Sequence, residues 1–254
     1  MTRTARTALM AGSVVGLLGL YVWAVTGLPD FGTAHSVYGT TINTVVSAER
    51  QSTNAVTAIV FDYRGFDTLG EEFILFISVV GVALLLREQR DETHAITAEA
   101  EAAEDHPRGS DAVRALGVAL VGVTVLLGLY IIVHGNLSPG GGFQGGVVLG
   151  AAFVGIYATG DFLTLRSLQP RAWMDAVHAA GAAGLALLAL GGLLAGGAFF
   201  HNFLYTGTTG LLQSGGTIPF DNAAVGLEVF GATVFLAAEF LHDAVIARRQ
   251  AATG

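Results

Sequence analysis

Residues 115–133 read ALGVALVGVTVLLGLYIIV, an apolar stretch without a charged side chain. The hydrocarbon core of a bilayer is about 30 Å thick, and a helix needs about 20 mostly apolar residues to cross it. Within lipid, the backbone polar groups of such a stretch are satisfied when it is helical. The stretch therefore predicts a transmembrane helix.

Apolar segments of similar length recur along the chain. Apolar residues make up 52% of the 254 positions and charged residues only 13%, whereas soluble domains carry about 25% charged residues. The predicted spans are residues 8–28, 69–87, 112–133, 143–165, 174–198 and 223–246. We therefore expect an all-α membrane protein of about six transmembrane helices.

The arginines predict the orientation of these helices. Every basic residue of the chain is an arginine, and an excess of basic residues marks the cytoplasmic connections of a membrane protein. Only Arg50 and Arg64 fall in the first, third and fifth connections. The others are Arg3, Arg6, Arg87, Arg90, Arg108, Arg114, Arg166, Arg171, Arg248 and Arg249. We therefore expect both termini in the cytoplasm.

The predicted spans fall into two blocks. Residues 1–87 would form a two-helix module and residues 112–246 a four-helix module, with a cytoplasmic tail at 247–254. Residues 88–111 between the blocks are rich in Asp and Glu, a composition typical of a solvated tether. We therefore expect an acidic cytoplasmic linker between two membrane modules.

The connection at residues 134–146 reads HGNLSPGGGFQGG. A P-loop needs a lysine, and this chain has none. The proline and the glycines instead predict a close-packed turn. Its structural residues would be Pro139, Gly140, Gly141, Gly142 and Phe143. Gly142, Gly146 and Gly150 then recur every four residues, which predicts a stripe that lets another helix approach closely.

The segment 61–72, FDYRGFDTLGEE, places charged residues directly before an apolar run. On one helix, Asp67 and Glu71 would share a face because they are four residues apart. Two carboxylates near a low-dielectric boundary would suit a proton or cation site. An interfacial cap in which Arg64 pairs with Asp67 is the alternative, and the sequence leaves both open.

A second set of titratable residues lies in the last predicted span. Glu239 follows Glu228 after eleven positions, which returns to within about 20° of the same helix face. His242 follows three positions later. A stripe of this kind suits a proton or cation path. The alternative places Glu239 and His242 at the level of the lipid headgroups.

The sequence gives no support to enzyme chemistry. The absence of cysteine excludes thiolate sites and Cys nucleophiles. There is no H-E-x-x-H metal motif and no G-x-S-x-G nucleophile elbow. The net charge of −8 argues against nucleic acid as a partner. We expect a protein that is not an enzyme and that holds no cofactor and no metal.

Two motifs resemble known families. Residues 129–147, LYIIVHGNLSPGGGFQGGV, resemble the signature of the B subunit of Mrp-type (multiple resistance and pH) sodium/proton antiporters, and this resemblance covers residues 112–246. The run FDTLGE, which ends at Glu71, resembles an MbhE-like module. That module forms the C-terminal end of the large MrpA protein in many Mrp systems and a separate small protein in membrane-bound hydrogenases. In this chain the MbhE-like module precedes the B module. A short, four-helix MrpB protein has no such module.

The resemblance implies a component of a multi-subunit sodium/proton antiporter related to the membrane arm of respiratory complex I. Its partners would be the other Mrp proteins (MrpA, MrpC, MrpD, MrpE, MrpF and MrpG), together with Na⁺, H⁺ and the bilayer of a prokaryotic plasma membrane. The resemblance also makes Asp67 and Glu71 candidates for ion translocation, and Pro139 and Phe143 structural residues.

Two other functions remain as alternatives. One is a structural or coupling subunit of a redox complex of the membrane-bound hydrogenase kind. The other is a self-sufficient small transporter, which the lack of a detectable inverted repeat disfavours. If the chain takes part in antiport, we expect Glu71→Gln to impair transport most, Glu228→Gln less, and Glu72→Gln least.

Overall fold

The computed structural model describes most of the chain, and every regular element in that part is helical. The described residues are 3–29, 32, 36–86, 110–158 and 171–253. They belong to two compact units, Met1–Asn43 and Thr44–Gly254. The expected class, an all-α membrane protein, is confirmed.

Five helices in the described residues are long and apolar enough to cross a membrane. Their apolar stretches are Thr7–Thr26, Gly65–Leu85, Ala115–Val133, Trp173–Gly196 and Ile218–Phe240. Each of them coincides with a predicted span. The remaining predicted span, 143–165, begins as a shorter apolar helix, Gly142–Ile156, and its residues after 158 lie outside the described part. The orientation of the termini stays a prediction.

The first unit contains α1 (Arg3–Thr26) and the first half of α2 (Val37–Arg50). The helix α1 is the one expected at residues 8–28. In contrast, α2 was not predicted, because its sequence VYGTTINTVVSAER mixes polar and apolar residues and has no apolar run of membrane length. The predicted linker lies almost wholly outside the described residues, which stop at 86 and resume at 110.

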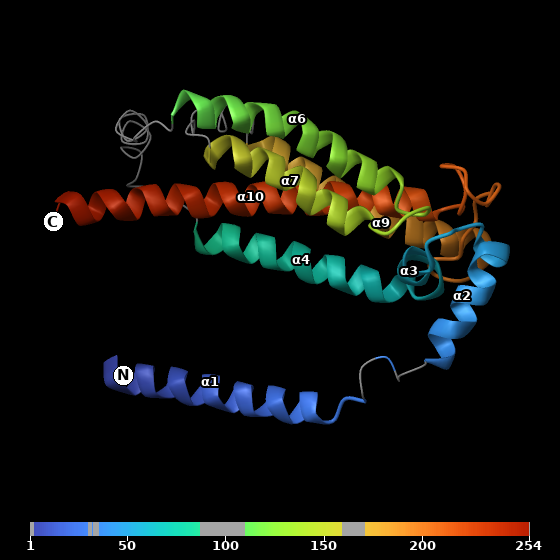
Figure 1. Cartoon of the computed structure of the whole chain (residues 1–254), viewed down its shortest axis with the longest axis horizontal. Helices are drawn as coiled ribbons and strands as arrows, with labels where there is room; N and C mark the ends of the chain where they lie inside the picture. Colours follow the sequence, from blue (N-terminus) through green and yellow to red (C-terminus); the bar gives the residue numbers. More distant parts are fainter. Residues whose placement is uncertain (1–2, 30–31, 33–35, 87–109, 159–170, 254) are drawn as a thin grey trace. The chain divides into compact units, whose positions relative to one another are not determined.

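The second unit holds the remaining helices. They are α3 (Ala55–Ala58), the π-helix η1 (Ile59–Tyr63), α4 (Gly65–Leu85), α6 (Asp111–Val133), α7 (Gly142–Ala158), α9 (Arg171–Gly196) and α10 (Ile218–Thr253). Among them, α10 contacts α4, α6, α7 and α9, so it is the central helix of this unit (Figure 1). The helix α7 runs in the same direction as α10, and α9 runs in the opposite direction.

Glycines bring α7 into backbone contact with α10. A Cβ atom on Gly146 would lie 2.8 Å from the carbonyl oxygen of Gly226 and 2.9 Å from Cβ of Val229. A Cβ atom on Gly150 would lie 2.8 Å from Thr233, and one on Gly142 would overlap the same helix. Because real Cβ atoms do not approach this closely, any side chain at these positions would push the two helices apart.

The packing of α9 on α10 also depends on glycine, this time from both helices. A Cβ atom on Gly181 of α9 would collide with the backbone of Glu228. A Cβ atom on Gly231 of α10 would lie 2.7 Å from the backbone nitrogen of His178. The two helices therefore meet backbone to backbone at the level of Glu228 and His178.

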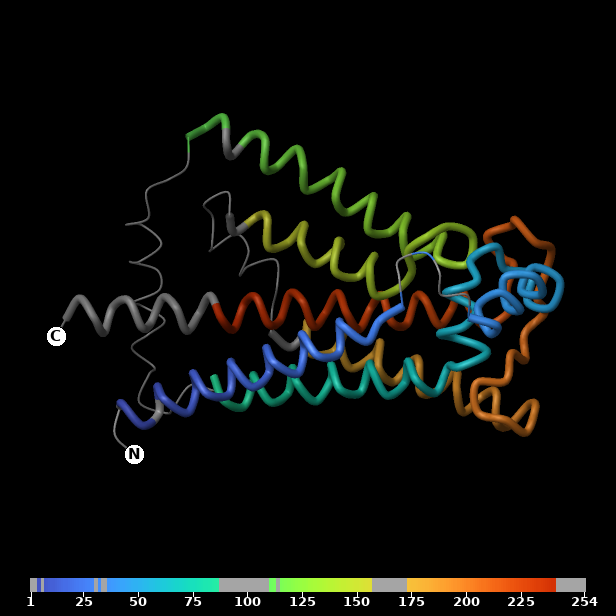
Figure 2. The backbone as a smooth tube through the Cα atoms, turned by 60° about the horizontal axis from the view of Figure 1, so that its bottom comes forward, coloured from blue at the N-terminus to red at the C-terminus, as the bar shows by residue number. Residues whose placement is uncertain are grey.

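Three connecting segments meet at one end of these helices, as the cyan, lime and orange parts of the tube show (Figure 2). Asn54 accepts hydrogen bonds from the backbone at the start of α3. Its amide nitrogen donates to the carbonyl oxygens of Gly135 and Ser138, both at 2.8 Å. The amide nitrogen of Asn136 donates to the carbonyl oxygen of Ser214 at 2.7 Å. These bonds join the segment before α3, the glycine-rich turn and the segment before α10.

The glycine-rich turn ends where α7 begins. Gly140 and Gly141 have φ angles of 129° and 150°, a region of the backbone map that favours glycine. The backbone nitrogen of Gly142 donates to Oδ1 of Asn222 on α10 at 2.8 Å. Pro139 and Phe143 are exposed. The turn therefore directs α7 onto α10 through its backbone.

We predict that Gly146→Leu destabilises the chain by about 1–3 kcal/mol or prevents its assembly, because the added side chain overpacks the contact of α7 with α10. Thermal unfolding of the detergent-solubilised protein, followed by size-exclusion chromatography, measures the effect. Gly122→Leu on α6 is the control, since a Cβ atom there meets nothing within 4 Å. Equal melting temperatures for the two variants would contradict the packing described above.

Candidate functional site

Two glutamates lie inside the helix bundle of the second unit. Glu228 on α10 is completely buried, and neither of its carboxylate oxygens has a hydrogen-bond partner among the described residues. Glu72 on α4 is 3% exposed, and its Oε2 atom likewise lacks a partner within the described part of the chain. Buried carboxylates without partners carry a large desolvation cost, so they mark candidate functional positions.

The helices that carry the two glutamates, α4 and α10, contact each other, and the charge of Glu72 acts on Glu228. Glu72 lies on α4 and Glu228 on α10, so the pair joins two helices of the second unit that are far apart in the sequence. Two negative charges in a medium of low dielectric constant repel each other strongly. Buried carboxylates of this kind suit a site that binds and releases a proton or a cation.

A histidine from a third helix lies against the backbone of α10 at Glu228. His178 on α9 is 4% exposed, and its Nδ1 atom lies 3.1 Å from the backbone carbonyl oxygen of Glu228. Since a carbonyl oxygen only accepts, Nδ1 donates this hydrogen bond, and Nε2 is then an acceptor. Among the described residues, Nε2 has no hydrogen-bond partner. The imidazole ring stacks on Phe76 of α4, with ring centroids 4.9 Å apart. Residues of α4, α9 and α10 therefore meet at the level of His178 and the Glu228 backbone.

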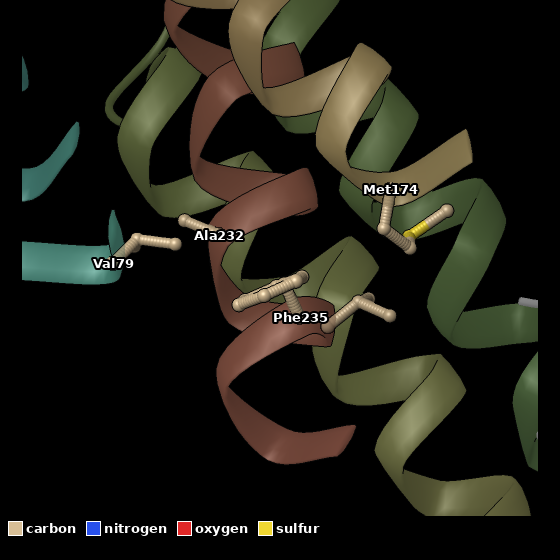
Figure 3. Close-up of a cluster of buried hydrophobic side chains, with 5 residues drawn as sticks. Val79, Met174, Ala232 and Phe235 are labelled. Atoms are coloured by element: carbon tan, nitrogen blue, oxygen red, sulfur yellow. The ribbon is translucent and has the colours of Figure 1, made fainter. Parts of the chain in front are cut away.

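An apolar cluster lies beyond this site along α10. Val79 comes from α4, Met174 from α9, and Ala232 and Phe235 from α10 (Figure 3). Val234 is the fifth member of the cluster. These α10 positions fall between Glu228 and Glu239 in the sequence. The cluster is an apolar layer between the levels of the two glutamates on α10.

The structure places the residues of the expected stripe on α10 as follows. Glu228 and Glu239 are both buried, with Glu239 3% exposed. At 1.5 Å per residue they stand about 16 Å apart along the helix axis. His242 lies further along α10, but its side chain is outside the described part. The stripe stays a proposal as an ion path.

The structure places the two candidates from the FDTLGE motif on the surface of this chain. Asp67 forms an exposed ion pair with Arg64, as the cap alternative expected. Glu71 is exposed, whereas its neighbour Glu72 points into the bundle. The interior carboxylate of this segment is therefore not the one that the motif singled out. Asp67 and Glu71 therefore lie outside the buried pair, although the charge of Glu71 acts on Glu72, and they stay proposals for a role at the surface.

The register of α4 explains why Glu72 was overlooked. The buried residues of this helix are Gly65, Thr68, Glu72 and Val79. They recur at helical spacing, but most are small or polar, while the large apolar residues of α4 are exposed. In a membrane helix the apolar face can meet lipid and the polar face the protein. The spacing of Thr68 and Glu72 was the signal that could have identified the interior face.

Among the described residues, no three His, Cys, Asp or Glu side chains are grouped so that they could hold a metal ion.

Comparison with protein families matches both modules. Residues 112–235 match the family described as a domain related to the MnhB subunit of Na⁺/H⁺ antiporters. Residues 2–103 match the MbhE family, which is described as the E component of MBH.

Two curated relatives are similar to the chain. An uncharacterized protein of Methanocaldococcus jannaschii is 29% identical over 216 residues, which cover 78% of this chain and 81% of that protein. A probable A/B component of a K⁺/H⁺ antiporter of Rhizobium meliloti is 30% identical over 145 residues, or 50% of this chain. The match covers only 14% of that longer protein.

Two solved structures have a similar fold. A chain of the membrane-bound sulfane sulfur reductase, an archaeal respiratory membrane complex, aligns with a TM-score of 0.69 at 28% identity. That alignment covers 92% of this chain and 98% of the other. A chain of the Mrp complex from Dietzia sp. DQ12-45-1b aligns with a TM-score of 0.68 at 25% identity and covers 94% of this chain but 26% of the other. Both similarities extend across the two modules.

A double-mutant cycle tests the contact between the two glutamates. Each of Glu72→Gln and Glu228→Gln removes a buried charge and its repulsion, so we expect neither to destabilise the chain. The two changes should be coupled by about 0.5–3 kcal/mol, because the second substitution has no repulsion left to relieve. Unfolding in mixed micelles measures these free energies.

The matched control for this cycle combines Glu228→Gln with Asp175→Asn, a change at an exposed carboxylate of α9. That pair should be additive. Additivity of Glu72→Gln with Glu228→Gln would show that the two carboxylates do not interact.

Proposed function

We propose a role in ion translocation for this chain, which is an MnhB-like subunit of the Mrp type with an MrpA-like MbhE module at its N-terminal end. It is a membrane subunit of a multi-subunit cation/proton antiporter complex. Within that complex, the cluster of Glu72, Glu228 and His178 would carry a proton or a cation across the interior of the second unit. The observation that carries the proposal is the buried pair Glu72 and Glu228, contributed by different modules.

The geometry supports a transfer step rather than a structural role for this pair. A structural ion pair would match each carboxylate with a cation or with hydrogen-bond donors. Here the Glu228 oxygens have neither among the described residues, and Oε2 of Glu72 also lacks a donor there. A site that must bind and release a proton or a cation benefits from oxygens that stay available. His178, which is bonded to the backbone carbonyl of Glu228, is a further titratable group at the same level of α10.

The apolar layer at Val79 and Phe235 would act as a barrier to this step. It lies between the level of the pair and that of Glu239 along α10. Transfer between the two levels would then require water to enter or side chains to rotate. An antiporter needs such a barrier, because a permanently open path would let protons leak.

The proposed partners are the other proteins of an Mrp-type complex, and the proposed location is the plasma membrane of a prokaryote. The transported cation could be Na⁺ or K⁺, since the family description names Na⁺ and the Rhizobium meliloti relative is named for K⁺. Transport assays should therefore use both ions.

A second candidate function is a coupling subunit of a respiratory redox complex. The observation that favours it is the alignment with the membrane-bound sulfane sulfur reductase, which covers 98% of the matching chain. Purification of the native complex separates the two candidates. A complex made only of antiporter proteins would support the first, and iron–sulfur or other redox proteins in it would support the second.

The burial of Glu72 replaces the expectation from sequence that Glu72→Gln would be tolerated better than Glu71→Gln. We predict that Glu72→Gln and Glu228→Gln each lower cation/proton exchange to about a tenth of the wild-type rate or less. Glutamine keeps the size of the side chain but cannot exchange a proton, and the loss of a proton-transfer group commonly costs roughly two orders of magnitude. Exchange is measured in membrane vesicles that contain the whole complex, with Na⁺ and with K⁺.

Asp111→Asn, at an exposed carboxylate of α6, is the control and should transport at the wild-type rate, and immunoblots of the complex establish that each variant assembles. Wild-type exchange by an assembled Glu72→Gln complex would refute the proposed role of the pair.

A further inference from the structure

A second buried carboxylate cluster lies at the loop end of the bundle, apart from the pair at Glu72 and Glu228. Asp221 in the first turn of α10 is 1% exposed, and neither carboxylate oxygen has a well-formed hydrogen bond with the described residues. The hydroxyl of Thr217 lies one turn earlier and interacts with the Asp221 carboxylate. A carboxylate so deeply buried needs a counter-ion, a proton or better donors.

The π-helix η1 faces this carboxylate, and it contacts α10. Asp62 of η1 lies close enough to Asp221 for the two carboxylates to repel each other. Only 6% of the Asp62 side chain is exposed, and Nε of Arg50 lies 2.8 Å from its Oδ2 atom. A π-helical turn inside a helical segment often marks a functional site. Here it places a carboxylate opposite the start of α10.

Asn202 ties the two sides of this cluster together. Its amide nitrogen donates to Oδ2 of Asp62 at 3.0 Å and to the carbonyl oxygen of Gly215 at 2.9 Å. Its Oδ1 atom accepts from the backbone nitrogen of Thr217 at 2.9 Å. The cluster is therefore built from η1, the segment before α10 and the first turn of α10, and its polar groups are held in place on three sides.

The charges of the cluster do not cancel. Arg50 carries one positive charge, and Asp62 and Asp221 carry two negative charges when both are ionised. Burial and a hydrogen bond to Glu49 raise the pKa of Tyr63 to about 12, so this nearby phenol stays neutral. Glu49 itself is exposed and screened by solvent. One uncompensated negative charge remains at Asp221.

We propose that Asp221 and Asp62 bind one alkali cation at this end of the bundle. Oxygen ligands suit hard cations, and one monovalent ion neutralises the cluster, whereas a divalent ion would leave it positive. Irregular backbone beside a helix end commonly supplies carbonyl oxygens for Na⁺ in membrane proteins. The segment Ser214–Thr217 before α10 is irregular in this way. The proposal concerns binding by this chain and does not depend on transport through Glu72 and Glu228.

The test uses the purified full-length chain in nanodiscs. The melting temperature is measured in NaCl, KCl and choline chloride at equal ionic strength, and ²³Na line broadening reports binding directly. We expect Na⁺ or K⁺ to raise the melting temperature above its value in choline. Asp221→Asn should lose that increase, and Asp175→Asn should keep it.

The result that overturns the proposal is an equal melting temperature in all three salts, or an alkali-dependent increase that survives in Asp221→Asn. If Asp221→Asn does not fold, the ²³Na signal of the wild-type chain alone tests the proposal. Its ²³Na signal must be broadened and must sharpen when K⁺ but not choline is added, and an unbroadened signal refutes the site. A chain that binds no cation but loses antiport in Glu72→Gln would refute this site and leave the proposed function standing.

Discussion

The second unit depends on the contact of the α10 backbone with two neighbouring helices. Gly146 on α7 and Gly181 on α9 leave no room for a Cβ atom against α10. In lipid the hydrophobic effect does not drive helices together, so close van der Waals packing of this kind has to hold them. The same contacts remove the middle of α10 from both lipid and water. Any polar side chain that points inward from that segment is then buried.

The inward carboxylates of α10 follow from this constraint. Glu228 is buried because Gly181 lets α9 lie directly over its backbone. Glu72 reaches the same place from α4, and His178 arrives on α9 through a hydrogen bond to the Glu228 carbonyl. Burial at Glu228 without compensating donors costs several kcal/mol, which a fold would not retain for stability alone. The packing of α10 thus connects the structure of the bundle with the proposed exchange of protons and cations.

The sequence could predict the membrane helices, because a span is recognised from length and apolar composition alone. It could also single out Glu228, since a charge inside an apolar span is conspicuous. It could not identify Glu72, which stands beside Glu71 in the sequence and differs from it only by about 100° around the helix. That distinction depends on which face of α4 meets α9 and α10, and no local pattern specifies the partner helix.

Other features depended on contacts between distant segments. The spacing of the glycines on α7 indicated close packing against another helix, but it did not indicate that this helix is α10. Asp221 fell just before the predicted span, so its burial followed only from the segments around residues 62 and 202 that fold over it. The helix α2 carries too few apolar residues to be seen as a span, and it was taken for part of a connection.

The most direct measurement of the central claim, that Glu72 of one module lies beside Glu228 of the other, is a chemical cross-link. The chain has no cysteine, so Glu72→Cys together with Glu228→Cys introduces its only thiols. A protease site inserted within residues 88–109 allows the modules to be cut apart after treatment of the assembled complex with a short bis-methanethiosulfonate reagent. The account predicts that the two fragments stay joined on a gel, and that Glu71→Cys with Glu228→Cys leaves them separate. Fragments that separate in the first variant and stay joined in the second would contradict it.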